Sequence, residues 1–243
     1  MGWTLPAAAR GVWVKIPAVE VIEVLATAGV DFVVVDREHG AIDLRAMNAM
    51  IAVGHALGLP VFVRVPGHAP AEVQPALDAG ASGVFVPHVD DRARALEVVD
   101  ACRFPPLGHR HGSPTNRAGD WGTVDVAELV RRGNEGVMLV AQVETPDAVA
   151  NIEGILDVAG VDAVFIGPFD LALSSGLAAA SPDFVTLVEQ VERAAAGRTA
   201  LGGVAPATRA DDLVAKGYSF VLVGADTTLL ADSARELTRR GVG

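Results

Sequence analysis

The chain has 243 residues, of which 51% are hydrophobic and 5% aromatic, and its formal net charge is −11. This length suits one catalytic α/β domain over residues 1–243, whose apolar content can build a core without disulfides. The negative charge and the scattered arginines disfavour nucleic-acid binding. Cys102 is the single cysteine and is expected to be a buried thiol, so a disulfide framework is excluded.

Short β-branched runs alternate along the chain with Ala- and Leu-rich segments of helical length, and Gly or Pro marks most junctions. Their apolar runs are continuous, as in parallel strands that are covered on both faces. Strands are expected near Val12–Ile16, Phe32–Asp36, Val61–Val65, Gly83–Val86, Val137–Val143, Ala163–Ile166, Ala200–Val204 and Phe220–Val223. Helices are expected at Ala18–Ala28, Leu44–Leu57, Ala71–Ala79, Asp91–Cys102, Pro146–Leu156, Pro182–Ala196, Arg209–Lys216 and Thr227–Arg240. This alternation predicts an α/β fold of the (β/α)8 TIM-barrel type.

The segment from Phe104 to Arg117 interrupts this alternation. It is long and polar, starts with two prolines and is poor in helix formers. A loop of this length in a compact domain is usually functional or disordered. Arg110 and Arg117 are therefore weaker site candidates that could reach over the barrel mouth or into a neighbouring subunit, and a solvated excursion is the alternative.

Acidic residues stand where two successive apolar strands end, which in a TIM barrel is the face that carries the chemistry. Glu144 follows one strand and Asp170 follows the next. Two carboxylates without a Cys or multi-His cluster suit Mg²⁺ or Mn²⁺, with Co²⁺ as a substitute. The competing interpretation is that both acids serve as helix caps or first-turn acids.

Further polar residues are predicted at the same face. Asp36 and His39 lie three residues apart after the second strand, and Arg64 ends the third. An ion pair at the rim is the alternative for Arg64, and a structural hydrogen bond is the alternative for His39. His88 is a weaker candidate for a substrate contact, because a rim histidine usually only completes a hydrogen bond. Asp226 is expected to cap the last helix.

Several phrases of the chain, in this order and spacing, resemble the HpcH/HpaI family of class II, metal-dependent pyruvate aldolases. The resemblance extends from about Gly11 to the C-terminal helix. Its phrases are Asp36–Gly40, Val63–Pro66, Phe104–Arg110, Gln142–Thr145, Gly160–Leu171 and Val223–Leu230. A TIM barrel is the fold that this resemblance implies.

The resemblance also implies a reaction. A lyase of this family carries out reversible retro-aldol cleavage of 4-hydroxy-2-oxo acids into pyruvate, or a pyruvate analogue, and an aldehyde through a metal-stabilised enolate. By this resemblance Glu144 and Asp170 hold the metal, while His39 is the acid/base that Asp36 orients. Arg64 faces the keto oxygen.

The substrate-binding residues expected from the same resemblance are Arg64, Gly167, Phe169 and Asp170. Backbone N–H groups of Phe169 and Asp170 lie where a strand turns into a helix, and such groups bind carboxylates. Decarboxylation of oxaloacetate is an expected side activity. Arg110 is followed by His111 where many relatives carry glycine, and this loop shapes the aldehyde side in relatives.

The expected partners are small-molecule 2-oxo acids and aldehydes, with no nucleic acid and no membrane, and the family resemblance implies a homohexamer. Residues Met1–Pro6 lack the basic and apolar pattern of a signal peptide, and no apolar run has the length of a membrane span. A cytoplasmic location is therefore expected.

Three other functions compete with this one. A citrate-synthase-like enzyme on the same scaffold condenses oxaloacetate with an acyl-CoA. A Schiff-base aldolase needs a lysine at the mouth, and Lys15 is the candidate because Lys216 lies in a helix that leads to the other end. A non-catalytic barrel that serves as a binding module is the third.

Overall fold

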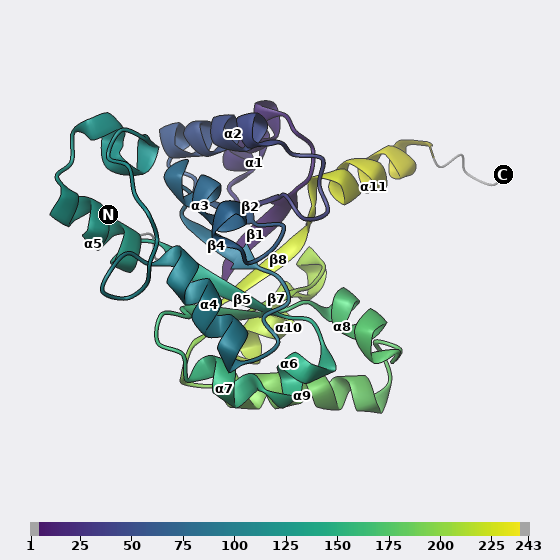
Figure 1. Cartoon of the computed structure of the whole chain (residues 1–243). Helices are drawn as coiled ribbons and strands as arrows, with labels where there is room; N and C mark the ends of the chain where they lie inside the picture. The colour runs from purple at the N-terminus through teal and green to yellow at the C-terminus, as the bar shows by residue number, and fades with distance from the viewer. Residues whose placement is uncertain (1–4, 239–243) are drawn as a thin grey trace.

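The computed structural model describes residues 5–238, in which eight parallel strands close into a barrel in sequence order (Figure 1). Each strand pairs with the next, and β8 pairs with β1 to close the ring. The prediction of a (β/α)8 TIM barrel is confirmed. The strands are β1 Ala9–Val14, β2 Phe32–Asp36, β3 Val61–Arg64, β4 Gly83–Val86, β5 Met138–Val143, β6 Ala163–Ile166, β7 Ala200–Val204 and β8 Phe220–Ala225.

Helices connect the strands and surround the barrel (Figure 1). They are α1 Val19–Ala28, α2 Leu44–Leu57, α3 Pro70–Asp78, α4 Arg92–Cys102, α5 Val126–Glu135, α6 Pro146–Ala150, α7 Ile152–Leu156, α8 Pro168–Ser175, α9 Pro182–Ala195, α10 Ala210–Ala215 and α11 Asp226–Thr238. Two 3-10 helices, η1 Arg117–Gly122 and η2 Ala207–Arg209, lie in the connections. None of the helices in residues 5–238 is long and apolar enough to cross a membrane.

The first strand and one helix differ from their expected bounds. The strand expected at Val12–Ile16 is β1, which starts earlier and ends at Val14, so Lys15 lies just beyond it. The helix expected over Pro146–Leu156 breaks at Asn151, whose φ of −96° and ψ of 8° are not helical. Position 151 is not a glycine or proline, so the sequence carried no signal for this break, which is a feature of the local backbone geometry.

Two helices were missed, and one expected helix runs past the described residues. The connection between β4 and β5 contains α5, whose N-terminus is capped by the Asp125 carboxylate accepting from the N–H of Glu128. The loop that follows β6 contains α8. The helix expected at Thr227–Arg240 is α11, and the expected positions 239 and 240 lie outside the described residues.

The outward side chains of the strands form a core with the surrounding helices. This layer is rich in Val, Leu, Ile and Ala, and alternate strand residues such as Val33, Val35, Val61 and Val63 belong to it. Alternation along each strand places the remaining residues inside the barrel. The strands are therefore covered on both faces, as their continuous apolar runs predict.

The interior of the barrel is packed with aromatic rings. Its large members come from six strands and are Trp13, Phe32, Phe62, Phe85, Phe165 and Phe220. Seven edge-to-face ring contacts have centroid separations from 5.4 to 6.1 Å. This is a favoured arrangement for aromatic pairs. The rings fill the lower part of the barrel, so the open space lies above them.

Glycines make room for these rings. A Cβ atom on Gly202 would lie 2.1 Å from Cε2 of Phe220, and one on Gly11 would lie 2.3 Å from Cζ of Phe32. Both distances are far below van der Waals contact. These strand positions therefore require glycine for packing, although their backbone is ordinary.

The last helix, α11, projects away from the barrel (Figure 1). It contacts β1 and β8 at the mouth. Leu229, Leu230 and Leu237 on this helix are 44%, 65% and 88% exposed. An exposed apolar row of this kind is a common feature of an association surface.

Candidate active site

A cavity of about 540 Å³ lies at the C-terminal ends of the strands. Side chains from β1, β3, β5 and from the loops after β2 and β6 line it. Six residues that the sequence predicted for the site lie in its wall, namely His39, Arg64, Glu144, Gly167, Phe169 and Asp170. The structure therefore brings most of the expected site together in one space.

Glu144 follows β5 and is only 2% exposed. One of its oxygens accepts the backbone N–H of His88 at 3.2 Å, and the other accepts the side-chain amide of Gln142. Burial, helped by the negative charges of Glu38 and Asp170, raises the pKa of the Glu144 carboxyl from 4.5 to about 6 against the lowering effect of His88. A bound cation would remove this electrostatic cost.

Asp170 lies in the first turn of α8 and is half-buried in the wall of the same cavity. Gly167 lets the loop approach Glu144, since a Cβ atom there would lie 2.7 Å from Glu144 Cγ. Neither carboxylate forms an ion pair with a lysine or arginine of residues 5–238. Two acids in one cavity without a lysine or arginine partner form an all-oxygen donor set, which fits a hard divalent cation.

The donor set from the protein is small. Residues 5–238 contain no group of three or more His, Cys, Asp or Glu side chains placed to hold a metal ion. Mg²⁺ and Mn²⁺ sites commonly use one or two carboxylates and leave further positions to water and substrate oxygens. The pair Glu144 and Asp170 therefore fits a catalytic cation better than a closed structural site.

Asp36 and Arg64 form a buried ion pair at the ends of β2 and β3. Arg64 Nε donates to Asp36 Oδ1 at 2.9 Å and Nη2 donates to Oδ2 at 2.6 Å. The guanidinium also lies over the ring of Trp13, 4.4 Å from its centroid. Burial alone would raise the pKa of Asp36, but the hydrogen bonds and charge of Arg64, with smaller contributions from His39 and Lys15, hold it below its ordinary value.

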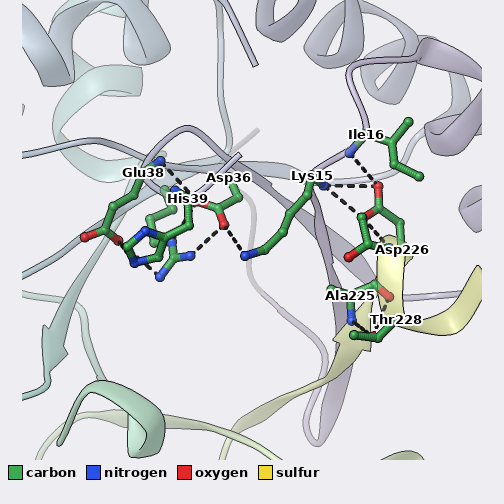
Figure 2. A network of polar contacts seen from close by, with 10 residues as sticks. Lys15, Ile16, Asp36, Glu38, His39, Ala225, Asp226 and Thr228 are labelled. Carbon is green, nitrogen blue, oxygen red and sulfur yellow. Dashed lines mark hydrogen bonds and ion pairs between the residues drawn. The ribbon is translucent and has the colours of Figure 1, made fainter. Parts of the chain in front are cut away.

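The expected side-chain contact between Asp36 and His39 is not present, which corrects the proposed orienting role of Asp36. Asp36 Oδ1 instead accepts the backbone N–H of His39 at 3.1 Å, and the side chain of Arg64 donates to both carboxylate oxygens. The imidazole Nε2 of His39 lies 3.9 Å from Glu38 Oε2, and its side chain is 52% exposed (Figure 2). Asp36 therefore positions the loop that carries His39, and the ring remains open to the cavity.

His88 lies next to the site in an unusual backbone conformation. Its φ of 53° is in the left-handed region, which is rare for a residue with a side chain. Its imidazole lies between Glu38 and Glu144, at 3.8 Å from an oxygen of each. Strained backbone is often retained at functional sites. The structure thus brings this weaker candidate to the rim of the site.

Comparison with known proteins agrees with this geometry. The family model HpcH/HpaI aldolase/citrate lyase matches residues 10–233. A 2-keto-3-deoxy-L-rhamnonate aldolase from Escherichia coli (strain K12) is 35% identical over 229 residues, which cover 92% of this chain and 85% of the relative. The chain belongs to the HpcH/HpaI aldolase/citrate lyase family. The predicted family and the predicted enzyme class, a class II aldolase and thus a carbon–carbon lyase, are confirmed.

Solved structures support the same assignment. An HpcH/HpaI aldolase/citrate lyase family protein from Burkholderia cenocepacia J2315 superposes with a TM-score of 0.89 at 31% identity, over 96% of this chain and 93% of that chain. The citrate synthase SbnG superposes with a TM-score of 0.81 at 26% identity, over 95% of each chain. Aldolase and citrate-forming relatives therefore share this barrel.

Arg110 and Arg117 do not reach the cavity of this HpcH/HpaI chain, which corrects their placement over the mouth. Arg110 Nη2 donates to Asp78 at 3.0 Å, and its guanidinium stacks on Phe104 at 4.5 Å. Arg117 donates to Asn48 at 2.8 Å. Both line a separate pocket beside the residues that precede β4 and β5, at the opposite end of the barrel. The segment after α4 runs toward the end of the barrel opposite the cavity, and the composition of the segment does not predict this direction.

Gln142 is a candidate that sequence reasoning missed in this HpcH/HpaI barrel. It is fully buried, lines the cavity and donates its amide to Glu144. Its Oε1 atom is buried without a hydrogen-bond partner among the described residues. A signal was present, because Val140, Gln142 and Glu144 follow the alternation of one strand face. A polar side chain on the inward face of a buried strand needs a hydrogen-bond partner, which for Gln142 is the Glu144 carboxylate.

Proposed function

We propose that this chain is a single catalytic domain that cleaves a 4-hydroxy-2-oxo acid reversibly into pyruvate, or a pyruvate analogue, and an aldehyde. The observation that carries this proposal is the shared cavity of Arg64 and His39 with Glu144 and Asp170, two acids that have no lysine or arginine partner among residues 5–238. The name of the Escherichia coli relative, an aldolase of a 2-keto acid, agrees with a 2-oxo acid substrate.

Glu144 and Asp170 are the proposed ligands of a divalent cation, Mg²⁺ or Mn²⁺, with Co²⁺ as a substitute. When bound, such a cation supplies Lewis acidity to the oxygens of a 2-oxo acid. The raised pKa of Glu144, caused first by burial, supports this assignment because a cation there would favour the ionised carboxylate.

The remaining groups bind the 2-oxo acid. Backbone N–H groups of Phe169 and Asp170 at the start of α8 are placed to receive its carboxylate, and Pro168 has no N–H to offer. Arg64 lines the same cavity and faces the position of the keto oxygen, where negative charge develops as the carbon–carbon bond breaks.

His39 is the proposed proton carrier. In the cleavage direction it takes the proton of the 4-hydroxyl while the C3–C4 bond breaks and the aldehyde leaves. The electron pair of that bond forms the enolate, and C3 then receives a proton to give pyruvate. The half-exposed imidazole can exchange protons with water between these steps.

A citrate-synthase-like reaction is the second candidate. The superposition with the citrate synthase SbnG supports it, since the same enolate chemistry would serve an acyl-CoA acceptor. A thioester assay with oxaloacetate and an acyl-CoA separates the two candidates. Decarboxylation of oxaloacetate is a proposed side activity, because it forms the same enolate.

The proposed working form is a cytoplasmic homo-oligomer, a hexamer by family resemblance. The exposed leucines of the projecting helix α11 support self-association through this helix. A charged residue in place of Leu230, which is 65% exposed, is expected to reduce the assembly size measured by light scattering. Unchanged size would place the interface elsewhere.

Deuterium exchange from solvent into the methyl group of pyruvate tests the proposed function. EDTA-treated protein is expected to exchange only after Mg²⁺ or Mn²⁺ is added. Exchange that survives chelation, together with borohydride trapping of pyruvate on Lys15, would support a Schiff-base enzyme instead. Absence of exchange under every condition would leave the acyl-CoA reaction or a non-catalytic barrel.

A further inference from the structure

Lys15 is a charged residue of the cavity wall to which the proposed reaction gives no role. It directly follows β1, and its Nζ lies 3.2 Å from Asp36 Oδ2 (Figure 2). The side chain is 30% exposed. The other lysine, Lys216, lies after α10 on the outside and pairs with Glu192 at 3.4 Å. Lys15 is therefore the lysine that can act on the chemistry.

The backbone of Lys15 is held in place by a second buried acid. Asp226 at the start of α11 is 7% exposed, and its carboxylate accepts the N–H of Lys15 at 3.0 Å and that of Ile16 at 2.9 Å (Figure 2). It also accepts the N–H of Thr227 at 2.7 Å. Asp226 is the first residue of α11 and not its cap, so the expected capping role is wrong, and its carboxylate instead holds the end of β1. This anchor directs the Lys15 side chain across the mouth to Asp36.

The charges around Arg64 do not balance without Lys15. Arg64 makes two hydrogen bonds to Asp36, and its Nη1 lies 3.1 Å from Glu38 Oε2. Their side chains are 7%, 0% and 12% exposed, so solvent screens these charges poorly. One guanidinium between two carboxylates carries a net negative charge. Such a group would oppose, rather than stabilise, negative charge on a nearby substrate oxygen.

Asp36 does not need Lys15 for its hydrogen bonds. Besides the two bonds from Arg64, its Oδ1 accepts the N–H groups of Glu38 and His39, each at 3.1 Å. Three of these donors bind Oδ1 and one binds Oδ2, so each carboxylate oxygen has a hydrogen-bond partner without Lys15. The contribution of Lys15 is its positive charge, which makes the group of Lys15, Asp36, Glu38 and Arg64 neutral.

We propose that Lys15 is a positioning residue whose charge, acting through Asp36, allows Arg64 to stabilise the enolate oxygen. This inference rests on the proposed function. It distinguishes Lys15 from a Schiff-base nucleophile, since its side-chain nitrogen pairs with the Asp36 carboxylate. It also distinguishes Lys15 from a substrate ligand, since its effect passes through Asp36.

Lys15→Met tests this role by removing the charge. In the Mn²⁺-loaded enzyme we expect deuterium exchange into pyruvate to fall about 10- to 100-fold. This is the range typical of residues that orient the groups in direct contact with a metal or substrate. Lys15→Arg keeps the charge and is expected to recover most of the rate. Lys216→Met is the matched control, because this lysine lies outside the cavity.

A second variant separates charge from shape. Glu38→Gln added to Lys15→Met removes one negative charge and restores neutrality, so it is expected to recover at least half of the lost rate on a logarithmic scale. Failure to recover would show that Lys15 contacts the substrate or only supports the fold.

Binding of an enolate analogue provides a measurement that a purely structural role would not change. Oxalate resembles the pyruvate enolate, so Lys15→Met is expected to weaken oxalate binding to the Mn²⁺-loaded enzyme more than pyruvate binding. Equal weakening overturns the inference. If the wild type shows metal-dependent exchange and Lys15→Met exchanges equally fast, this inference alone is overturned. If the wild type shows no metal-dependent exchange, the proposed function is overturned together with it.

Discussion

The lower and upper halves of the barrel interior are built by the same strands but depend on different forces. On β1 the inward residue Trp13 is followed two positions later by Lys15, and on β3 Phe62 is followed by Arg64. In the lower half, rings pack edge to face and exclude water. In the upper half, charged groups line an open cavity and satisfy one another.

This difference shows how one strand face serves two purposes. The lower half is insensitive to charge and intolerant of lost or added volume, because its rings are close-packed. The upper half is sensitive to each charge, since its carboxylates, Arg64 and Lys15 are buried or half-buried, where solvent screens charge poorly. Variants in the lower half should therefore change stability, and variants in the upper half should change chemistry.

The largest expected effect comes from Glu144→Ala in the upper half. Loss of one of two proposed metal ligands should lower metal-dependent exchange into pyruvate by about 10³-fold, because a bound cation supplies several kcal/mol of charge stabilisation. Mn²⁺ affinity, measured by calorimetry, should fall in parallel. Glu97→Ala on the outer surface is the control. If Glu144→Ala bound Mn²⁺ with wild-type affinity, Glu144 would not be a metal ligand.

Phe85→Ala in the lower half should have the next largest effect, on stability. Phe85 is 1% exposed and contacts four other rings, so its truncation should lower the free energy of unfolding by about 3–5 kcal/mol. Chemical denaturation measures this change. Val24→Ala, at a 66% exposed position, should cost far less. Equal losses for both would contradict a close-packed interior.

The acidity of Glu144 predicts a pH dependence of the metal-free protein. The folded pKa of Glu144 is raised, chiefly by burial, from 4.5 to about 6, so between these values the folded state binds more protons than the unfolded state. Stability from this group is complete below the unfolded pKa and is lost as the pH rises through the folded pKa. The loss amounts to about 2 kcal/mol.

Denaturation in EDTA at pH 4 and pH 7 measures this loss, with Glu144→Gln as the reference that cancels other titrations. Added Mn²⁺ should stabilise the wild type more at pH 7 than at pH 5, because a metal binds the ionised carboxylate. A wild type and a Glu144→Gln variant with the same pH dependence would show that the carboxyl has an ordinary pKa.

Gln142 lies at the boundary of the two halves. The substitution Gln142→Leu should have the smallest effect. This change keeps the volume but removes the amide that donates to Glu144, so Mn²⁺ affinity should fall about tenfold. Denaturation should show little loss, because the unpartnered Oε1 disappears as well. A large loss of stability with intact affinity would place Gln142 with the structural residues.

Much of the fold could be predicted from local sequence. Continuous apolar runs separated by helical segments predicted all eight strands, and seven of the expected strands overlap closely with the observed bounds. The helix α5 and the break at Asn151 were missed, because local backbone geometry and packing decided them. Glu144, Asp170 and Arg64 were predictable, since residues just past parallel strands converge at one end of a barrel.

Only the tertiary structure decided which partners these residues have. Sequence spacing suggested that Asp36 contacts the imidazole of His39, but closure of β2 against β3 brings Arg64 to Asp36 instead. Pairing of β1 with β2 brings Lys15 to Asp36, and pairing of β1 with β8 brings Asp226 to the backbone of Lys15. The sequence by itself determined which residues stand at the mouth, because strand alternation is local. Their pairing depends on distances between strands, which no single strand contains.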